Sequence, residues 1–324
     1  MNNDAIKYYL TRFLKEMDFD LAQFTGTTDR ALEERSTQIW NAYVLDSTVN
    51  AYGLKYLPMC CRISHMTYQG HPLDVKAYCA VYTLFHVLMD PQDHVGVHKV
   101  ALCDLERFVL LSGNAKEMTH PMLGPFARFL LSETALSFSP IQTVGLFKSS
   151  LDYLLGCLCE QKFPQGVPSS TEDFPGWLRY KTGLGEPYAY FFLSCVEKEK
   201  RDHYLPVVPL ITEYIQYVND ILSIYKEHCD SEGNNYASHA SHALSIGTDD
   251  AMIQLAEKVQ EIKRKIIHFG SENNILDISL KLIKGYIAWH ITEDRYRLRE
   301  IGIVMTNASD HAEAQRSGEG AQAS

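Results

Sequence analysis

Several long stretches of this chain repeat apolar residues every three or four positions, and this period limits what the chain can fold into. Such spacing places the apolar side chains on one face of an α-helix, whereas a half-buried strand needs strict alternation. β-Branched runs are short, as in IGIVMT at residues 301–306, and they lack turns at hairpin spacing. We therefore expect an all-α protein without a sheet. The clearest helical stretches are LDYLLGCLCEQ (151–161), VPLITEYIQYVNDILSIYKE (208–227), MIQLAEKVQEIKRKII (252–267) and ISLKLIKGYIAWHITEDRYRL (278–298).

Breaks between the helical stretches indicate one bundle rather than several domains. Gly, Pro, Ser and Asn cluster at residues 113–125, 162–176 and 229–247, which we interpret as loops between helices. After residue 306 the chain has no large apolar side chain whose burial could offset the entropy of ordering. The sequence thus predicts one helical domain over residues 1–306 and a disordered tail over 307–324.

The charge balance excludes one class of partner. Forty acidic against thirty basic residues give a formal net charge of −10, so we expect no basic surface that could bind a nucleic-acid backbone. The first nineteen residues carry charges in every turn and contain neither a signal-peptide core nor a membrane span. We expect a cytoplasmic protein with no nucleic-acid partner and no membrane span.

The strongest local motif is VNDILSIYKE, in which Asn219, Ser223 and Glu227 recur every four residues. This spacing gives one slowly drifting stripe of side chains on a helix. An amide oxygen, a hydroxyl and a carboxylate are hard donors of the kind that bind Mg²⁺ together with substrate phosphates. A polar helix face turned to water would explain the same three residues, and that alternative stays open here.

Two further segments carry arginines that could bind phosphate. In FPGWLRYKTGLGEP, Arg179 could clamp a diphosphate with its planar guanidinium, although a surface ion pair is the commoner use of such a residue. In WHITEDRYRLRE, Arg295 and Tyr296 could act with Lys226 on the oxygens of a leaving diphosphate. An ordinary salt-bridged helix is the alternative for this second segment.

Taken together, the acidic helix end in FHVLMDPQDHV (85–95), the FPGWLR segment, NDxxSxxxE and the late RY pair resemble class I terpene cyclases. The resemblance is to the fungal trichodiene synthase-like sesquiterpene synthases, and it covers roughly residues 75–305. It implies a single helical bundle around a deep apolar pocket, in which up to three Mg²⁺ ions and diphosphate-binding residues ionise farnesyl diphosphate.

The resemblance also implies roles for individual residues. Asn219, Ser223 and Glu227 would hold one Mg²⁺, and Arg179 would sense the diphosphate. Diphosphate would be bound by Lys226, Arg295 and Tyr296. Aromatic faces steer a carbocation without quenching it, and the positions that would face the pocket are Tyr82, Tyr153 and Trp289, each of which could equally be core packing.

The chain departs from the family at the aspartate-rich motif. Aligning VLMDPQD on Asp-Asp-x-x-Asp puts Met89 at the first aspartate, Asp90 at the second and Asp93 at the last. A thioether is a poor ligand for Mg²⁺, and one step along a helix turns a side chain by about 100°. Pro91 disfavours helical backbone at the residue before it, so we expect the helix to unwind at Asp90 and re-aim its carboxylate.

Three hypotheses follow from this departure. The first is a Mg²⁺-dependent sesquiterpene cyclase, a lyase that uses Asp90 or Asp93 opposite the Asn219 stripe. The second is a cyclase-fold enzyme with altered chemistry, which joins an external amine or water to a terpenoid cation or starts from protonation. The third is a non-catalytic terpenoid-binding protein. The sequence leaves open a small amine co-substrate, a homodimer, the isoprenoid chain length and the product skeleton.

Overall fold

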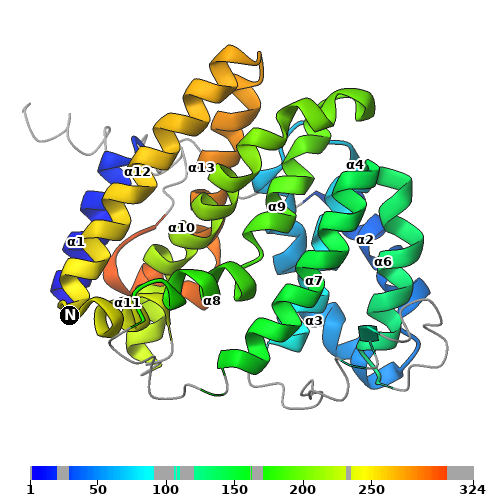
Figure 1. The fold of residues 1–324 in the computed structure, drawn as a ribbon. Coiled ribbons are helices and arrows are strands. Elements are labelled where there is room, and N and C mark those ends of the chain that lie inside the picture. The colour runs from blue at the N-terminus through cyan, green and yellow to red at the C-terminus, as the bar shows by residue number, and fades with distance from the viewer. Residues whose placement is uncertain are drawn as a thin grey trace, which may run out of the picture.

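The helical stretches predicted from the sequence form a bundle in the computed structural model (Figure 1). The structure describes residues 2–19, 29–90, 106, 108–109, 120–160, 162, 171–230 and 235–304, and within these ranges it contains no β-strand, which confirms the all-α prediction. The α-helices are α1 (Asn3–Glu16), α2 (Arg30–Tyr43), α3 (Ser47–Thr67), α4 (Leu73–Met89), α6 (Leu123–Ser137), α7 (Pro140–Glu160), α8 (Phe174–Thr182), α9 (Gly185–Phe192), α10 (Val208–Cys229), α11 (Tyr236–Leu244), α12 (Thr248–Glu272) and α13 (Leu276–Thr292). The 3₁₀ turns are η4 (Leu193–Cys195), η5 (Lys198–Val207), η6 (Asp294–Tyr296) and η7 (Leu298–Ile301).

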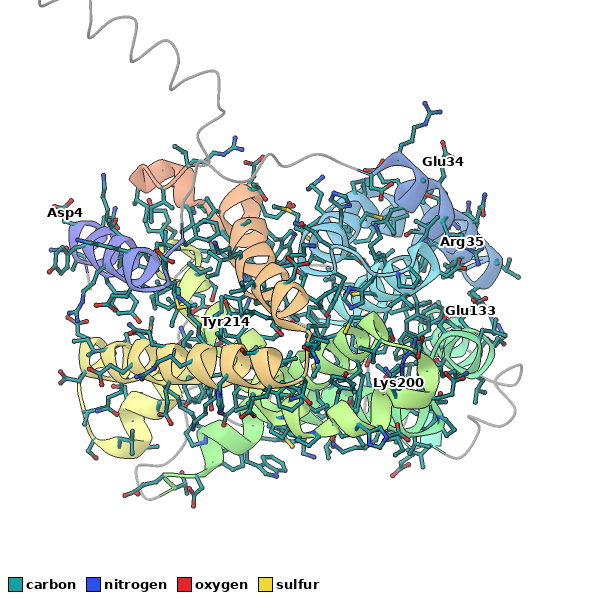
Figure 2. All side chains as sticks on the ribbon, turned by 90° about the horizontal axis from the view of Figure 1, so that it is seen from above. Asp4, Glu34, Arg35, Glu133, Lys200 and Tyr214 are labelled. Atoms are coloured by element: carbon teal, nitrogen blue, oxygen red, sulfur yellow. The ribbon has the colours of Figure 1, made fainter. Side chains whose placement is uncertain are left out.

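Two helices, α4 and α10, run through the interior and form two of the walls of the site. α4 is buried along nearly its whole length and packs on α2 and α3, while α10 packs on α9, α12 and α13. Figure 2 shows charged side chains such as Glu34 and Arg35 at the outside of the bundle. Tyr214 of α10 is fully buried, and its hydroxyl donates to the Ile283 carbonyl oxygen of α13 at 2.9 Å. This bond helps to fix α10 against α13, whose end carries the RY pair.

Glycines allow two helix pairs to approach closely beside the cleft. A Cβ atom at Gly285 of α13 would lie only 1.9 Å from the Met66 carbonyl oxygen of α3. A Cβ atom at Gly185, the first residue of α9, would lie 2.3 Å from the Thr212 carbonyl oxygen of α10. Any side chain at either position would force the backbones apart, so both glycines set the width of the bundle around its interior.

The predicted loops at 113–125 and 162–176 overlap helices at their ends, since α6 begins at Leu123 and α8 at Phe174, and the third predicted loop contains a whole helix. Residues 229–247 contain α11, a helix that the Gly, Ser and Asn content of this stretch conceals. The Asn235 side chain caps this helix by accepting a hydrogen bond from the Ser238 backbone N–H at 2.8 Å. Ala237, Ala240 and Ala243 recur every three residues and are buried, and α11 packs on α8 and α12. Small alanines let a short helix pack closely, a pattern too weak to stand out from sequence.

The predicted boundary at residue 306 and the predicted tail at 307–324 lie outside the described residues, so both stay predictions. In the described part of the chain, no helix combines the length and apolar character that a membrane crossing requires.

Candidate active site

The site is a cleft with two adjoining compartments between α4, α7, α8, α10 and α13. One compartment, of about 150 Å³, is lined mainly by polar and charged side chains, and we call it the polar compartment. The other, of about 170 Å³, has more apolar and aromatic walls, and we call it the apolar compartment. The walls of both include Asp90, Tyr153, Arg179, Thr182, Asn219, Arg295 and Tyr296. The cleft can therefore hold a charged group and a hydrocarbon side by side.

α10 brings Asn219, Ser223 and Glu227 together on the wall of the polar compartment. The flanking Ile221 and Leu222 are fully buried, which fixes the rotation of the helix and turns the stripe inward. The Ser223 hydroxyl donates to the Glu227 carboxylate at 2.5 Å. Because Ser223 is only 4% exposed, the stripe is not an ordinary helix face turned to water.

Arg179 of α8 lies against α10 and does not project outward as a surface ion pair would. Its guanidinium binds the Asp220 carboxylate at 2.9 and 3.0 Å. It also donates to the Gln216 carbonyl oxygen and to the Asn219 amide oxygen, each at 3.1 Å. Burial raises the pKa of the Asp220 carboxyl, and the charge of Arg179 opposes this shift. Arg179 is thus held at the cleft wall by Asp220, Gln216 and Asn219.

Lys226, Arg295 and Tyr296, the predicted diphosphate-binding residues, also line the polar compartment. α13 ends at Thr292, and the η6 turn then presents Arg295 and Tyr296 to the cleft. The Arg295 guanidinium lies over the Tyr296 ring, 5.7 Å from its centre. The alternative for this segment is an ordinary salt-bridged helix. Arg299 forms a surface ion pair of this kind, with Asp294 at 3.6 Å. Three cationic side chains, those of Arg179, Lys226 and Arg295, therefore face one compartment.

The end of α4 has the geometry expected from Pro91. The helix ends at Met89, and Asp90 is extended, with φ −64° and ψ 120°. Asp90 lines both compartments, whereas Met89 is only 5% exposed and lines neither. The unwinding of the helix at Asp90 is confirmed, and its carboxylate lies across the cleft from α10. Asp93, the second predicted ligand on this side, lies outside the described residues.

The predicted aromatic residues divide into two groups. Tyr153 lines both compartments and Trp289 lines the apolar compartment, as expected. Tyr82 is a correction, because it lines neither compartment and is fully buried in the core. Its hydroxyl lies 3.0 Å from the Ser150 hydroxyl of α7, and its ring packs on Phe126 and Phe191. Helix rotation turned this residue toward α7, which spacing within one helix could not reveal.

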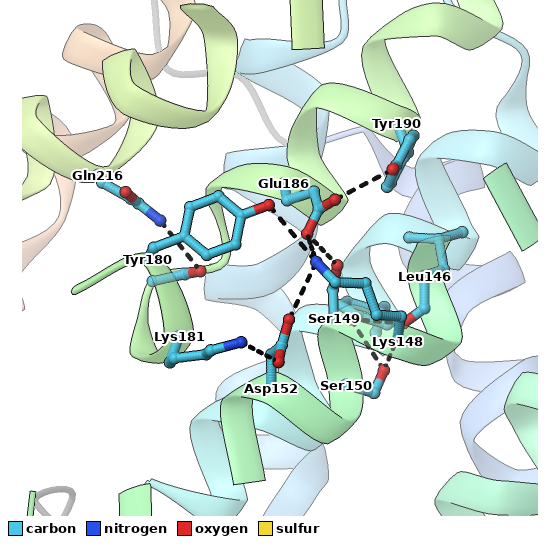
Figure 3. A network of polar contacts seen from close by, with 12 residues as sticks. Leu146, Lys148, Ser149, Ser150, Asp152, Tyr180, Lys181, Glu186, Tyr190 and Gln216 are labelled. Atoms are coloured by element: carbon cyan, nitrogen blue, oxygen red, sulfur yellow. Dashed lines mark hydrogen bonds and ion pairs between the residues drawn. The ribbon is translucent and has the colours of Figure 1, made fainter. Parts of the chain in front are cut away.

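A network of ion pairs fastens the segment that carries Arg179 (Figure 3). Lys181 of α8 pairs with Asp152 of α7, and Lys148 of α7 pairs with Asp152 at 3.0 Å and with Glu186 of α9 at 2.7 Å. The Tyr190 hydroxyl completes the network by donating to Glu186 at 3.1 Å. These contacts tie the break between α8 and α9 to α7, so the wall that holds Arg179 is fixed from behind.

Several residues in or behind the cleft were missed from sequence, among them Asp220, Glu160 and His290. Asp220 is the partner of Arg179 and stands next to Asn219 in the NDxxSxxxE motif, so its position could have suggested it. Glu160, at the end of α7, lines the polar compartment, and burial raises the pKa of its carboxyl to about 7, with Asp90 adding to the shift and Arg179 opposing it. His290 of α13 is fully buried behind Asn219. Burial lowers the pKa of this imidazole to about 3.

The oxygen donors fit a divalent cation only in combination with a ligand. Within the described ranges, no three His, Cys, Asp or Glu side chains are placed to hold a metal ion. Asn219, Ser223 and Glu227 offer one amide oxygen, one hydroxyl and one carboxylate, which suits Mg²⁺ when phosphate oxygens complete its coordination. The residues present therefore fit a Mg²⁺ ion that arrives with a diphosphate better than a metal held by the protein alone.

Sequence comparisons match most of this chain to known proteins. The family model described as Trichodiene synthase (TRI5) matches residues 62–317. The longiborneol synthase CLM1 of Gibberella zeae is 24% identical over 301 residues, which cover 90% of this chain and 86% of that protein. An (E)-beta farnesene synthase of Metarhizium brunneum is 28% identical over 252 residues, which cover 74% of this chain and 73% of that protein. A trichodiene synthase of Stachybotrys chartarum is 29% identical over 170 residues, 51% of this chain and 44% of that protein.

Solved structures support the fold. The linalool/nerolidol synthase of Streptomyces clavuligerus superimposes with a TM-score of 0.56 at 13% identity, covering 84% of this chain and 99% of that chain. A cucumene synthase superimposes with a TM-score of 0.56 at 13% identity, covering 85% of this chain and all of that chain. At this identity the likeness establishes the arrangement of the helices, while the chemistry rests on the residues of the cleft.

Proposed function

Because the chain belongs to the trichodiene synthase family and is a terpene synthase, we propose that it ionises farnesyl diphosphate with Mg²⁺ and cyclises the resulting cation to a sesquiterpene. One observation carries this proposal: the Asn219 stripe and three cationic side chains line one compartment, and this compartment adjoins an aromatic one. The relatives named as longiborneol, farnesene and trichodiene synthases support the choice of substrate class.

The division of the cleft assigns each half of the substrate a place. The diphosphate would lie in the polar compartment, where Arg179, Lys226 and Arg295 favour the charge that develops as the leaving group departs. The hydrocarbon would lie in the apolar compartment, against the faces of Tyr286 and Trp289. Aromatic faces attract an allylic cation and offer it no strong nucleophile. Tyr153 would contact the substrate at the junction of the two compartments.

Asn219, Ser223 and Glu227 would hold Mg²⁺ on one side of the diphosphate, and Asp90 would face them from the end of α4. When bound, Mg²⁺ supplies positive charge that neutralises the leaving diphosphate. Up to three such ions would accompany the substrate, with Asp93 as a further ligand on the α4 side. The residues of the chain would orient the diphosphate.

Met89 favours a second candidate function. The diphosphate-facing wall on α10 is complete, whereas the first aspartate of the family motif is absent from α4. An enzyme with altered chemistry would fit this combination, for example one that adds an amine or water to a terpenoid cation or that starts from protonation. A cytoplasmic location, a fungal source, a homodimer and an amine co-substrate stay predictions.

Incubation of the purified protein with farnesyl diphosphate, with and without Mg²⁺, tests the proposal. We expect Mg²⁺-dependent release of diphosphate together with an extractable cyclic hydrocarbon, measured by a diphosphate assay and by gas chromatography with mass spectrometry. Diphosphate release with an amine or alcohol product in place of a hydrocarbon would favour addition of an external nucleophile, and a cyclic product without diphosphate release would favour the protonation-initiated form. An absence of release at any Mg²⁺ concentration would contradict the proposal.

A further inference from the structure

His290 connects the backbone of α13 to the side chain of Asn219. Its ring is fully buried, with Nδ1 2.8 Å from the Tyr286 carbonyl oxygen and Nε2 3.1 Å from the Asn219 amide nitrogen. The rings of Tyr286 and Tyr296 enclose the imidazole at centre distances of 4.6 and 4.5 Å. Asn219 is therefore approached from behind by a side chain that does not line either compartment.

The partners of the imidazole determine its tautomer. A carbonyl oxygen can only accept a hydrogen bond, so the proton lies on Nδ1 and points to Tyr286. In the neutral ring Nε2 then carries a lone pair and must accept. The group that faces Nε2 must be a donor, which is the NH₂ of Asn219 and not its oxygen.

The opposite side of Asn219 requires the same orientation. Arg179 has only donors, and its guanidinium lies 3.1 Å from the amide oxygen of Asn219. With the amide turned over, two donors would face each other at Arg179 and two acceptors at His290. The NH₂ group also lies 3.3 Å from the Tyr296 hydroxyl, which can accept its second hydrogen. Two neighbours thus dictate one orientation of this amide, and the third accommodates it.

We propose that His290 is a positioning residue that fixes the amide of Asn219, so that its oxygen faces Arg179 and the cleft while its NH₂ faces α13. The consequence for Mg²⁺ rests on the proposed function, since only the oxygen of an amide can bind a hard cation. Hydrogen-bond partners behind a metal ligand typically change metal affinity by about 10- to 100-fold when they are removed.

The chain contains a matched control for a buried imidazole. His86 of α4 is also buried, and its Nδ1 lies 2.7 Å from the carbonyl oxygen of Tyr82, four residues earlier, as in the His290 arrangement. His86 lines the apolar compartment but not the polar one, so it is a control for the binding of Mg²⁺ and inorganic diphosphate and not for activity. Its Nε2 differs, because that atom has no hydrogen-bond partner in the described structure. Replacing His86 therefore removes the same ring with the same backbone bond, but it leaves the hydrogen bonds of Asn219 unchanged.

The test measures the Mg²⁺ concentration that gives half of the thermal stabilisation by inorganic diphosphate. We expect His290→Phe to raise this concentration by about 10- to 100-fold, while His86→Phe leaves it unchanged. His290→Gln places an acceptor oxygen near the position of Nε2 and should stay close to the wild type. Equal effects of His290→Phe and His86→Phe, or equal effects of His290→Phe and His290→Gln, would overturn the proposal.

A double variant separates orientation from packing. In the wild-type background, Asn219→Asp places a carboxylate against the Nε2 lone pair and should weaken the Mg²⁺ response. In the His290→Phe background the same change should restore much of it, because a carboxylate presents oxygen in either orientation. Loss in both backgrounds would show that His290 only fills space.

Nuclear magnetic resonance of ¹⁵N-labelled histidines provides a readout that does not depend on the proposed function. The His290 signals, identified by their absence in His290→Phe, should show a proton on Nδ1 and a lone pair on Nε2. The opposite tautomer would overturn the inference even if the protein cyclises farnesyl diphosphate. The expected tautomer together with no Mg²⁺ response in the wild type would uphold the amide orientation and contradict the proposed function.

Discussion

The two walls of the polar compartment are built in different ways. On the α10 wall, Asn219, Ser223 and Glu227 stand within a continuous buried helix, and Arg179, Tyr296 and His290 all bond to Asn219. On the α4 wall, the helix stops at Met89 and a single extended residue carries the Asp90 carboxylate. A half-site inside a helix is fixed by spacing and packing, whereas a half-site at a helix end depends on the backbone beyond it. This contrast predicts which changes the enzyme tolerates.

The largest effect should come from the α10 wall. Glu227→Gln keeps the size of the side chain but removes its charge, so we expect kcat/KM to fall at least about 100-fold, or about 3 kcal/mol of transition-state stabilisation. It should also weaken the Mg²⁺-linked melting shift caused by diphosphate. Steady-state kinetics and thermal melting check both effects.

Glu213→Gln is the control for this variant, because Glu213 lies on the same helix but pairs with Lys258 on the surface. It should leave both measurements unchanged. A wild-type melting shift in Glu227→Gln would instead show that the stripe does not bind Mg²⁺ together with diphosphate.

The next effect concerns the support of Arg179. Asp220→Asn removes the charge that faces a largely buried guanidinium, and we expect a loss of about 3 kcal/mol in the free energy of unfolding. Activity should also fall, since Arg179 loses the partner that holds it at the cleft. Urea unfolding and kinetics measure the two losses. The exposed pair of Asp277 and Lys281 provides the comparison, because Asp277→Asn should cost well under about 1 kcal/mol.

A smaller effect is expected on the α4 wall, where Met89 is buried away from the cleft. Met89→Asp should cost about 2 kcal/mol of stability by burying a carboxyl, and it should not increase diphosphate release. Met89→Leu keeps an apolar side chain and serves as the control. A clear gain of release in Met89→Asp would show that this departure limits the chemistry and would favour the altered-chemistry candidate.

The smallest effect is a dependence of stability on pH, with opposite sign at Glu160, which lines the cleft, and at His290, which lies behind it. The folded pKa of Glu160, near 7, is above its ordinary value. The protonated carboxyl therefore makes its full contribution to the free energy of unfolding at low pH, and this contribution is lost as the pH rises toward 7. In the metal-free protein, Glu160→Gln should therefore gain stability relative to the wild type at pH 8, by about 2 kcal/mol allowing for partial exposure, and little at pH 5. The exposed Glu199→Gln is the control in urea unfolding, and equal changes at both pH values would contradict the prediction.

At His290 the pH dependence of stability should have the opposite sign. The folded pKa of His290, near 3, is below its ordinary value. The neutral imidazole therefore makes its full contribution to the free energy of unfolding above about pH 6.5, and this contribution is lost as the pH falls. The expected loss is about 1.4 kcal/mol for each pH unit in this range. Comparing His290→Gln with the wild type from pH 7 to pH 5 measures it.

Much of the α10 wall could be predicted from the sequence, because its residues lie on one helix and their spacing fixes their direction. The same holds for the end of α4, where Pro91 determines the backbone of Asp90. Prediction failed at Tyr82, whose direction depends on how α4 packs against α7. It also failed at α11, where buried alanines replace the large apolar residues that mark other helices.

The sequence by itself determined the helical class, the stripe of oxygen donors, the arginine segments and the residue that breaks the aspartate-rich motif. These features depend on a local period, on the chemistry of single side chains, or on a family pattern. Only the tertiary structure decided that Asp220 holds Arg179, that Tyr82 is core packing and that His290 orients Asn219. These three contacts are between residues of α8, α10 and α13 or of α4 and α7. Such contacts form only when packing fixes the rotation of each helix.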